Sequence, residues 1–415
     1  MISLTRAVGA ARQNGAMSAP TPTPPRAPAP SLRSAMPPFE VMEMIERAAR
    51  HPDPLVLCVG EPGGGAPASV RDAAREALTG TLGYTPAAGM PALLDAIAGH
   101  YRAWYDLEVD PGRVMVTTGA SGGFMIAALC ALEPGDAVAL TVPGYPAYRN
   151  LLSALGAEVV EIRVGPHEQF RLTPAALERA HRIRPLRAVV LASPGNPTGT
   201  MLAAREVAAL AAWCAEAGVI LISDEIYHGL TYTGSRGACA LTAGRPDHTV
   251  IVGSFSKYWG MTGWRLGWLV LPESFVPAAR ALGSNLQLAA PTLAQTAALG
   301  AFTPQAYAEC DARVAETARA REIVLDWAPR LGWRSIAPPD GAFYLWAQVS
   351  GSGLTSREYC SRLLDHTGVA LAPGGDFDTR EGDDWVRLSF SPGSAVVAAA
   401  CERIAAWSVT AHARG

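Results

Sequence analysis

Lys257 is the only lysine in this chain of 415 residues, although 34 of its side chains are lysine or arginine. An arginine stays protonated at any working pH, whereas a lysine amine that is removed from water can lose its proton, attack a carbonyl group and form a Schiff base. The alternative is a bias of composition that happened to spare one position. Lys257 is therefore a candidate nucleophile, and its surroundings must decide between the two explanations.

Groups that can hold a phosphate lie near this lysine. Ser254 and Ser256 precede it and Arg265 follows it, and hydroxyls with a guanidinium fork are suited to bind phosphate oxygens. A second signal is Gly119-Ala120-Ser121-Gly122-Gly123, a run of small residues ahead of an apolar helix that begins near Phe124. Its backbone N–H groups are free to bind an anion at the positive end of the helix, although such a turn can also simply cap the helix.

Three further side chains with chemical potential lie at turns after apolar runs. Tyr145 offers an aromatic face on which a planar ring can stack. Asn196 lies in a turn fixed by two prolines and two glycines, and the carboxylate of Asp224 ends a buried run, where it needs a cationic partner. Packing on the next helix, a plain loop and a helix cap are the ordinary alternatives. The succession of these residues ahead of Lys257 indicates a single site.

The apolar runs before these residues predict the strands that position them. Several runs are continuous and β-branched, as expected for strands covered on both faces, and helical segments separate many of them. The fold class is therefore α/β, with a large domain built on a mostly parallel sheet of about seven strands flanked by helices. Ligands of such sheets bind at the carboxyl ends of the strands. The predicted strands are Val114–Gly119, Ala137–Val142, Glu158–Val164, Ala188–Ser193, Val219–Ser223, Thr249–Ser254 and Leu266–Leu271.

The pattern of elements changes after Thr303 and predicts a second, smaller α+β domain. A long helical stretch is followed there by strands at Ala342–Val349 and Trp385–Phe390. We expect the large domain to cover residues 67–303. The small domain is expected to combine residues 39–66 with residues 304–415.

Residues 1–38 are rich in proline and contain arginine but no acidic residue. A segment of this composition cannot build a core, so we expect a flexible tail. An import signal shares the arginine-rich, acid-free character, but so many prolines would break the amphipathic helix that it needs. We therefore interpret the segment as a dispensable leader or as the result of an upstream choice of start codon.

The bulk composition excludes several classes of function. Thirty-four basic and 37 acidic side chains leave a net charge of -3, which does not favour nucleic acid or an anionic membrane as a partner. The seven cysteines form no CxxC pair, which argues against a zinc site or a disulfide framework and fits a reducing compartment. The uncharged stretches Val114–Leu132 and Ala281–Ala308 contain polar residues and are interpreted as buried segments, not membrane spans. We expect a cytoplasmic protein without a metal.

Taken together, these residues resemble the class I/II aminotransferases of the aspartate aminotransferase superfamily, which are fold-type I pyridoxal-phosphate enzymes. The resemblance extends from about Glu40 to Trp407. Its most specific parts occur in order and at the spacing of the family: Asn196-Pro197-Thr198-Gly199, Asp224-Glu225-Ile226-Tyr227, Ser254-Phe255-Ser256-Lys257 and Gly263-Trp264-Arg265-Leu266-Gly267.

The resemblance implies pyridoxal 5'-phosphate as the cofactor and a role for each motif residue. Lys257 would hold the cofactor as an internal aldimine and then move the α proton of the substrate. Asp224 would keep the pyridine nitrogen protonated, Tyr227 and Asn196 would hydrogen-bond the phenolic oxygen, and Tyr145 would stack on the ring. The phosphate would be bound by Arg265, Ser254, Ser256 and the backbone N–H groups of Ala120 and Ser121.

The resemblance also concerns the substrate and the assembly. Arg387 corresponds to the fork for the α-carboxylate, with Asn196 and the backbone of Gly60 as further substrate contacts. Tyr84 resembles the tyrosine that family members donate to the phosphate of the neighbouring subunit, which implies a homodimer with shared active sites. The uncharged stretch Ala281–Ala308 would help to bury that contact. Preference for acidic or neutral amino acids stays open, because no remaining arginine matches a motif for a distal carboxylate.

Three functions remain on this scaffold. The leading hypothesis is an aminotransferase that moves the amino group of an α-amino acid to a 2-oxo acid through a pyridoxamine intermediate. A lyase of the β-eliminating carbon–sulfur type is the alternative, because fold and cofactor do not fix which bond breaks. The sensing domain of a transcription regulator is the third. That form carries a DNA-binding domain at its amino terminus, for which the Pro-rich tail offers no room.

Overall fold

The computed structural model describes residues 29–412. Most of the predicted tail, residues 1–28, lies outside the described residues, so its role stays a prediction. The described part of that segment has one short 3-10 turn at Leu32–Ser34 and leads into α1, which begins at Glu40.

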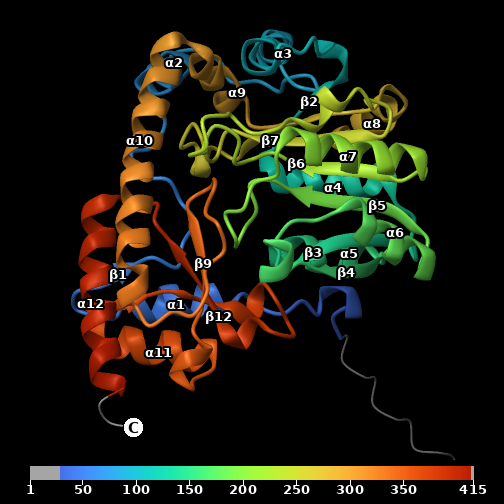
Figure 1. Cartoon of the computed structure of the whole chain (residues 1–415). Helices are drawn as coiled ribbons and strands as arrows, with labels where there is room; N and C mark the ends of the chain where they lie inside the picture. The colour runs from blue at the N-terminus through green and yellow to red at the C-terminus, as the bar shows by residue number, and fades with distance from the viewer. Residues whose placement is uncertain (1–28, 413–415) are drawn as a thin grey trace, which may run out of the picture.

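Seven strands form one mostly parallel sheet, and the fold class predicted from the sequence is confirmed (Figure 1). Their order across the sheet is β2-β8-β7-β6-β5-β3-β4. Only β8 runs antiparallel, to both β2 and β7. Each strand lies within two residues of its predicted bounds: β2 (Val114–Thr118), β3 (Ala137–Val142), β4 (Glu158–Arg163), β5 (Leu186–Ala192), β6 (Ile220–Asp224), β7 (Thr249–Ser254) and β8 (Leu266–Val270).

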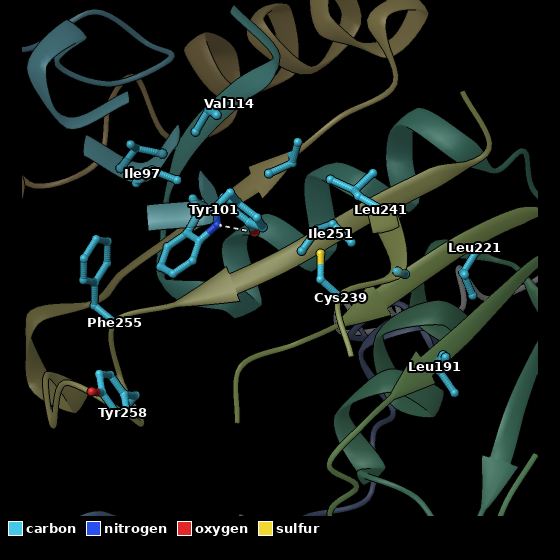
Figure 2. Close-up of a cluster of buried hydrophobic side chains, with 14 of the residues drawn as sticks. Ile97, Tyr101, Val114, Leu191, Leu221, Cys239, Leu241, Ile251, Phe255 and Tyr258 are labelled. Atoms are coloured by element: carbon cyan, nitrogen blue, oxygen red, sulfur yellow. Dashed lines mark hydrogen bonds between the residues drawn. The ribbon is translucent and has the colours of Figure 1, made fainter. Parts of the chain in front are cut away.

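Both faces of this sheet are buried, which explains the uninterrupted apolar runs in its strands. In β5, Val189 and Leu191 join the core on one face, whereas Val190 joins the core on the other. Figure 2 shows part of the first core, in which Leu191 and Leu221 from the strands lie with Tyr101 from a helix. The helices of this part are α2 (Ala68–Ala77), α3 (Pro91–Tyr105), α4 (Gly119–Ala131), α5 (Pro146–Leu155), α6 (Pro174–Ile183), α7 (Ala204–Glu216), α8 (Val276–Leu286) and α9 (Thr292–Ala298).

The C-terminal part builds a second, smaller α+β unit around its own core. A three-stranded antiparallel sheet has the order β11-β12-β9, and β1 pairs in parallel with β10, so a segment near the amino terminus joins this unit. The long helix α10 contacts α2 and also α12, which lie at different ends of it in Figure 1. The elements are α1 (Glu40–Ala48), β1 (Leu55–Val56), α10 (Pro304–Trp327), β9 (Tyr344–Gln348), α11 (Ser356–Thr367), β10 (Val369–Ala370), β11 (Ala372–Pro373), β12 (Trp385–Ser389) and α12 (Ser394–His412).

Residue types at the helix ends account for these bounds. Pro304 opens α10 after Thr303, whose hydroxyl accepts a hydrogen bond from the backbone N–H of Ala306 at 3.2 Å. Thr355 and Glu358 form a capping box at the start of α11, and Gly368, with a φ of 75°, follows its last residue. The exact domain boundaries stay a prediction. Within residues 29–412, no α-helix has both the length and the apolar character needed to cross a bilayer.

Candidate active site

The predicted site residues meet in one cavity between the large sheet and the C-terminal unit. The cavity has a volume of about 760 Å³, within the range of ligand sites in proteins. It lies at the carboxyl ends of β5, β6 and β7, where the topology of an open α/β sheet predicts a ligand. All predicted site residues except Tyr84 line it: Gly60, Ala120, Ser121, Tyr145, Asn196, Asp224, Tyr227, Ser254, Ser256, Lys257, Arg265 and Arg387.

Lys257 lies in the turn after β7, and its amine points into the cavity. Its Nζ donates a hydrogen bond to the backbone oxygen of Gly60 at 2.8 Å. The pKa of this amine is lowered from 10.5 to about 8, chiefly by burial and then by the charges of Arg387 and Arg265, against the opposing carboxylates of Glu61 and Asp224. An appreciable fraction of Lys257 is therefore an uncharged nucleophile near neutral pH.

Asp224 is the last residue of β6 and is buried. Its Oδ1 accepts a hydrogen bond from the backbone N–H of Ile226 at 3.1 Å, and its Oδ2 accepts one from the hydroxyl of Tyr148. Burial raises the pKa of this carboxyl from 3.8 to about 6, although both hydrogen bonds and the charge of Lys257 lower it. A cationic partner in the cavity, such as a protonated ring nitrogen, would remove the cost of the buried charge.

Sequence reasoning missed the role of Tyr148. It lies one helical turn after Tyr145 at the start of α5, and the two rings meet edge to face with centroids 5.4 Å apart. Both line the cavity. The i, i+3 spacing of the two tyrosines was the available signal.

The start of α4 and the turn around Arg265 form a close-packed cradle. Gly119 has a φ of 68°, and a Cβ there would lie 2.5 Å from Nη2 of Arg265. A Cβ on Gly267 would lie 2.7 Å from the backbone N of Ala120. Beside them the backbone N–H of Ser256 donates to Oγ of Ser254 at 3.0 Å. The donors and the helix start therefore converge on one place, as a phosphate requires.

Arg387 on β12 is a buried cation with an unused donor. Its guanidinium lies between the rings of Tyr344 and Phe377, with Cζ 4.4 Å and 4.6 Å from the two centroids. Nη1 donates to Oδ1 of Asn196 at 2.9 Å and Nη2 to the backbone oxygen of Cys58 at 2.6 Å. Its Nε has no hydrogen-bond partner among the described residues.

Tyr344 on β9 is a second cavity residue that sequence reasoning missed. Its hydroxyl lies 3.0 Å from the hydroxyl of Tyr227. It also explains why residue 60 is a glycine, because a Cβ on Gly60 would lie 1.8 Å from the Tyr344 hydroxyl. No motif near Tyr344 in the sequence indicates its contact with Gly60. The contact arises from the packing of the C-terminal unit against the large sheet.

The end of the segment that the sequence predicts as a flexible tail lies at the cavity. Met36, Pro37 and Pro38 line it together with Phe39 and Met42. A proline-rich segment cannot form a helix or a sheet interior, yet an extended one can still pack as a wall. At least these last residues of the segment are therefore part of the site.

Tyr84 lies away from the cavity of its own chain. Its side chain is 86% exposed, in the loop that leads to α3. The contribution of Tyr84 to a neighbouring subunit stays a prediction.

The donor set fits pyridoxal phosphate. A buried carboxylate that lacks a cation, an aromatic face at Tyr145 and an anion cradle at the start of α4 correspond to the nitrogen, the ring and the phosphate of the cofactor. The amine of Lys257 stands in the same cavity and can bond to the aldehyde carbon.

Comparison with known proteins agrees with this geometry. Residues 52–404 match the model of the family aminotransferase class I and II. The chain is 48% identical to valine–pyruvate aminotransferase of Mycobacterium tuberculosis over 91% of this chain and 98% of that protein. It is 34% identical to aspartate/prephenate aminotransferase of Thermus thermophilus over 85% of this chain and 90% of that protein.

Solved structures give the same result. The crystal structure of an aminotransferase from Mycobacterium tuberculosis has a TM-score of 0.89 at 47% identity and covers 92% of this chain and 99% of its own. The aspartate aminotransferase of Thermus thermophilus with maleate has a TM-score of 0.86 at 32% identity, with coverage of 91% and 99%. Nothing in these matches supports the lyase alternative.

Proposed function

The chain belongs to the class I and II aminotransferases and is a pyridoxal-phosphate-dependent transaminase, and from this premise we propose that its amino donors carry neutral, apolar side chains. Valine as donor and pyruvate as acceptor are the pair that the name of the relative from Mycobacterium tuberculosis suggests. The cations of the cavity carry the proposal about substrate class.

Only three of the described cavity-lining residues are cations: Lys257, Arg265 and Arg387. Each has a proposed task, at the cofactor, the phosphate or the α-carboxylate, so none of the cations that this chain itself places in the cavity is left for a second carboxylate on the substrate. Asp376 adds a negative charge to the same lining. A buried carboxylate without a partner costs more than the 1–3 kcal/mol typical of an unpaired polar group.

The wall formed by residues 36–42 supports the same substrate class. It contributes the side chains of Met36, Phe39, Val41 and Met42 to the cavity. Burial of apolar surface favours a donor side chain by about 0.8 kcal/mol for each methylene group removed from water. Methionine side chains also adapt to differently shaped apolar groups.

Arg387 is the proposed site for the α-carboxylate that every donor and acceptor shares. Its guanidinium is already desolvated between two aromatic rings, and its free Nε supports a bidentate pair with the carboxylate. Asn196 orients the guanidinium of Arg387 through its hydrogen bond to Nη1. The backbone of Gly60 lines the same cavity.

The cofactor is proposed to lie with its phosphate on Arg265, Ser254, Ser256 and the first N–H groups of α4 at Ala120 and Ser121. We propose that Asp224 holds a proton on the ring nitrogen and that Tyr145 stacks on the ring. Tyr227 and Asn196 are the proposed donors to the ring hydroxyl. When bound, pyridoxal phosphate supplies an electron sink for the electron pair released at the substrate's α carbon.

Lys257 is the proposed proton carrier. With the cofactor bound, Nζ would accept the proton from the α carbon of the substrate and hold it for return, and its lowered pKa would leave part of the amine uncharged near neutral pH for this task. The oxygen of Gly60, which accepts from Nζ at 2.8 Å, would orient the amine for this transfer.

We also propose a homodimer with shared sites, in the cytoplasm. Leu82, Tyr84, Leu286 and Leu288 are large apolar or aromatic side chains exposed on one chain. The segment that carries Leu82 and Tyr84 is joined to the start of α9, which follows Leu286 and Leu288 in the chain, by a hydrogen bond from the Thr292 hydroxyl to the oxygen of Gly83 at 2.6 Å. Such a surface supports burial against a second copy. All seven cysteines are free, which supports a reducing compartment.

A donor screen tests the proposed substrate class. The purified enzyme is given valine, leucine, alanine, aspartate and glutamate with pyruvate as acceptor, and kcat/KM is measured for each. We expect valine to exceed aspartate by at least about 100-fold, the equivalent of about 2.7 kcal/mol for an unpaired carboxylate. A higher kcat/KM for aspartate or glutamate would refute the proposal.

A further inference from the structure

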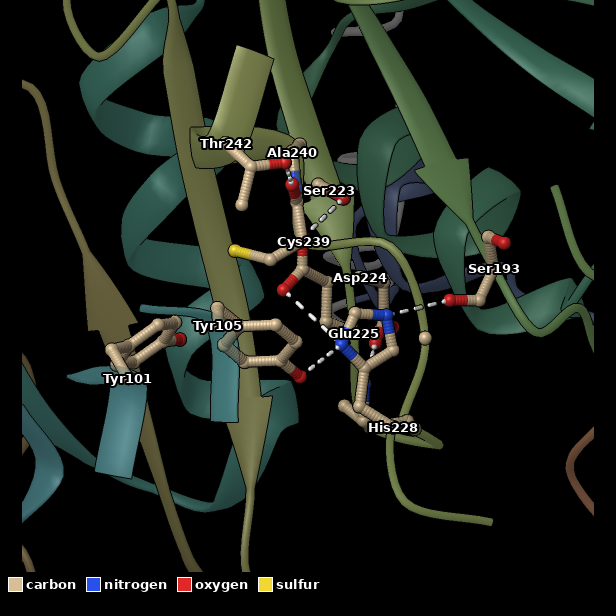
Figure 3. Close-up of polar contacts among 12 residues, drawn as sticks. Tyr101, Tyr105, Ser193, Ser223, Asp224, Glu225, His228, Cys239, Ala240 and Thr242 are labelled. Atoms are coloured by element: carbon tan, nitrogen blue, oxygen red, sulfur yellow. Dashed lines mark hydrogen bonds and ion pairs between the residues drawn. The ribbon is translucent and has the colours of Figure 1, made fainter. Parts of the chain in front are cut away.

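Two buried titratable side chains lie behind the cavity and take no part in the proposed chemistry. Glu225 and His228 follow Asp224 in the loop after β6, and neither lines the cavity. Figure 3 shows them beside Tyr105 of α3 and Ser193 at the end of β5. A buried histidine with hydrogen-bond partners on two other elements can hold those elements in a fixed relative position.

The partners of His228 fix its tautomer. Nε2 lies 3.1 Å from the backbone oxygen of Ser193, which can only accept, so Nε2 carries the proton. Nδ1 lies 2.7 Å from the hydroxyl of Tyr105, which donates to it. Burial lowers the pKa of His228 to about 4, so the ring is neutral near pH 7.

Glu225 completes the surroundings without forming an ion pair with the neutral ring. Its Oε1 accepts from the backbone N–H of Ala240 at 2.8 Å and from the hydroxyl of Ser223 at 3.1 Å. Its Oε2 lies 3.5 Å from Nδ1 of His228. Burial raises the pKa of Glu225 to about 7 against these hydrogen bonds. The other titratable groups in this region are His100, Tyr101, Cys239 and Arg236.

The hydrogen bond from His228 to Ser193 joins two loops of the active site. Tyr227 directly precedes His228, and Asn196 lies three residues after Ser193. The two side chains proposed to contact the ring hydroxyl therefore lie on the two loops that this hydrogen bond connects. The backbone of Gly237 packs closely against the imidazole of His228, since a Cβ added at Gly237 would lie 2.5 Å from Cδ2 of the ring. This packing leaves the ring little room to move. Tyr105 then anchors the ring to α3.

We propose that His228 is a positioning residue that fastens the Tyr227 loop to the Asn196 loop, with Tyr105 setting the tautomer in which Nε2 donates. The inference rests on the proposed roles of Tyr227 and Asn196 at the cofactor. His228 touches neither substrate nor cofactor and acts through these two side chains.

Two amide substitutions at His228 distinguish the contribution of Nε2 from that of Nδ1. Glutamine in His228→Gln places an N–H donor where Nε2 lies, whereas asparagine in His228→Asn replaces only the Nδ1 end and leaves Ser193 without its donor. His100→Asn is the matched control. His100 is also buried and its Nδ1 lies 2.9 Å from a tyrosine hydroxyl, that of Tyr307, but it does not line the cavity.

The affinity for pyridoxal phosphate and the pH at which the absorbance of the bound cofactor changes are measured for each variant without substrate. We expect His228→Asn to bind about tenfold more weakly and to move that pH by about one unit, each the equivalent of about 1.4 kcal/mol. His228→Gln should stay within about twofold, since the donated bond is kept. His100→Asn should lower the urea midpoint of unfolding but move neither cofactor measurement.

Equal losses in His228→Asn and His228→Gln, or cofactor measurements in His228→Asn that match those of His100→Asn, would overturn the inference. Tyr227→Phe separates its failure from failure of the premise. A shift in absorbance pH for Tyr227→Phe without one for His228→Asn refutes the positioning role alone. If Tyr227→Phe leaves that pH unchanged, the proposed role of Tyr227 is wrong, and the affinities of the two His228 variants still decide for or against the fastened loops.

Selective ¹⁵N-histidine NMR tests the tautomer in the unmodified chain, whether or not the asparagine variant folds. We expect a neutral, Nε2-protonated ring whose signal persists from pH 5 to pH 8 and is missing in His228→Gln. A Nδ1-protonated ring or an imidazolium at pH 7 would overturn the proposal.

Discussion

Replacing Asp224 by asparagine should stabilise the cofactor-free chain while it disables the site. Burial raises the pKa of this carboxyl from 3.8 to about 6 against the hydrogen bonds from Tyr148 and Ile226. The folded chain therefore holds the proton more tightly than the unfolded chain. Stability is lost as the pH rises from 3.8 through about 6, because the folded state must then contain an uncompensated charge.

The size of the effect follows from the pKa difference. A difference of about two units corresponds to about 3 kcal/mol at pH 8, where the carboxyl is ionised in both states. It falls below about 1 kcal/mol at pH 4, where the folded chain binds the proton and the unfolded chain binds it in part. Asparagine at position 224 keeps both contacts, since its Oδ1 accepts from Ile226 and its Nδ2 donates to the hydroxyl of Tyr148.

Urea unfolding of the cofactor-free chains at pH 8 and pH 4 provides the assay. Asp224→Asn should exceed the wild type in free energy of unfolding at pH 8 and approach it at pH 4. Asp326→Asn, at an exposed position of α10, should leave the free energy unchanged at both. Saturating pyridoxal phosphate should stabilise the wild type more than Asp224→Asn, since the variant lacks the carboxylate proposed to pair with the ring nitrogen. A less stable variant at pH 8, or a pH-independent difference, would refute the reasoning.

Further predictions concern the other groups of the cavity. Gly60→Ala should lower kcat/KM by at least about tenfold because its Cβ would overlap the Tyr344 hydroxyl, and Tyr344→Phe in the same chain should restore part of the loss by removing the nearest atom. Arg387→Lys should raise KM for valine by about 100-fold although the charge is kept, because a lysine lacks the planar fork; an unchanged KM would exclude Arg387 as the carboxylate site. The rate at which cofactor-free chain takes up pyridoxal phosphate should rise with pH and level off above about 8, as the free amine of Lys257 forms. A rate that rises steadily to pH 10 would mean an unperturbed amine.

The large sheet was predictable because its strands are covered on both faces. Continuous apolar runs such as that in β5, in which apolar and polar residues do not alternate, predict strands that are buried on both faces. The polar residues that follow these runs mark the carboxyl ends of the strands. The order of the strands was not predictable. The antiparallel insertion of β8 between β2 and β7 depends on the pairing of β8 with β2, which lies more than a hundred residues earlier in the chain.

The predicted site residues share one property. Each follows a predicted strand or lies in a short sequence motif, so neighbouring residues in the sequence are enough to identify it. Tyr148 and Tyr344 lack that property. The role of Tyr148 depends on how α5 is rotated against β6, and that of Tyr344 on how the C-terminal unit meets the large sheet. The wall at Met36 was missed for a different reason, because composition shows whether a segment can form regular structure but not whether it packs.

The two kinds of cation in the cavity explain why one lysine among so many arginines has a function. The delocalised guanidinium of Arg387 is held between two rings and two accepting oxygens. After burial, that fixed charge is the next largest cause of the lowered pKa of Lys257. If the α-carboxylate of a donor pairs with Arg387 as proposed, this repulsion would be offset and the pKa of Nζ would rise. Substrate binding would thus strengthen Lys257 as a base at the moment when a proton must leave the α carbon.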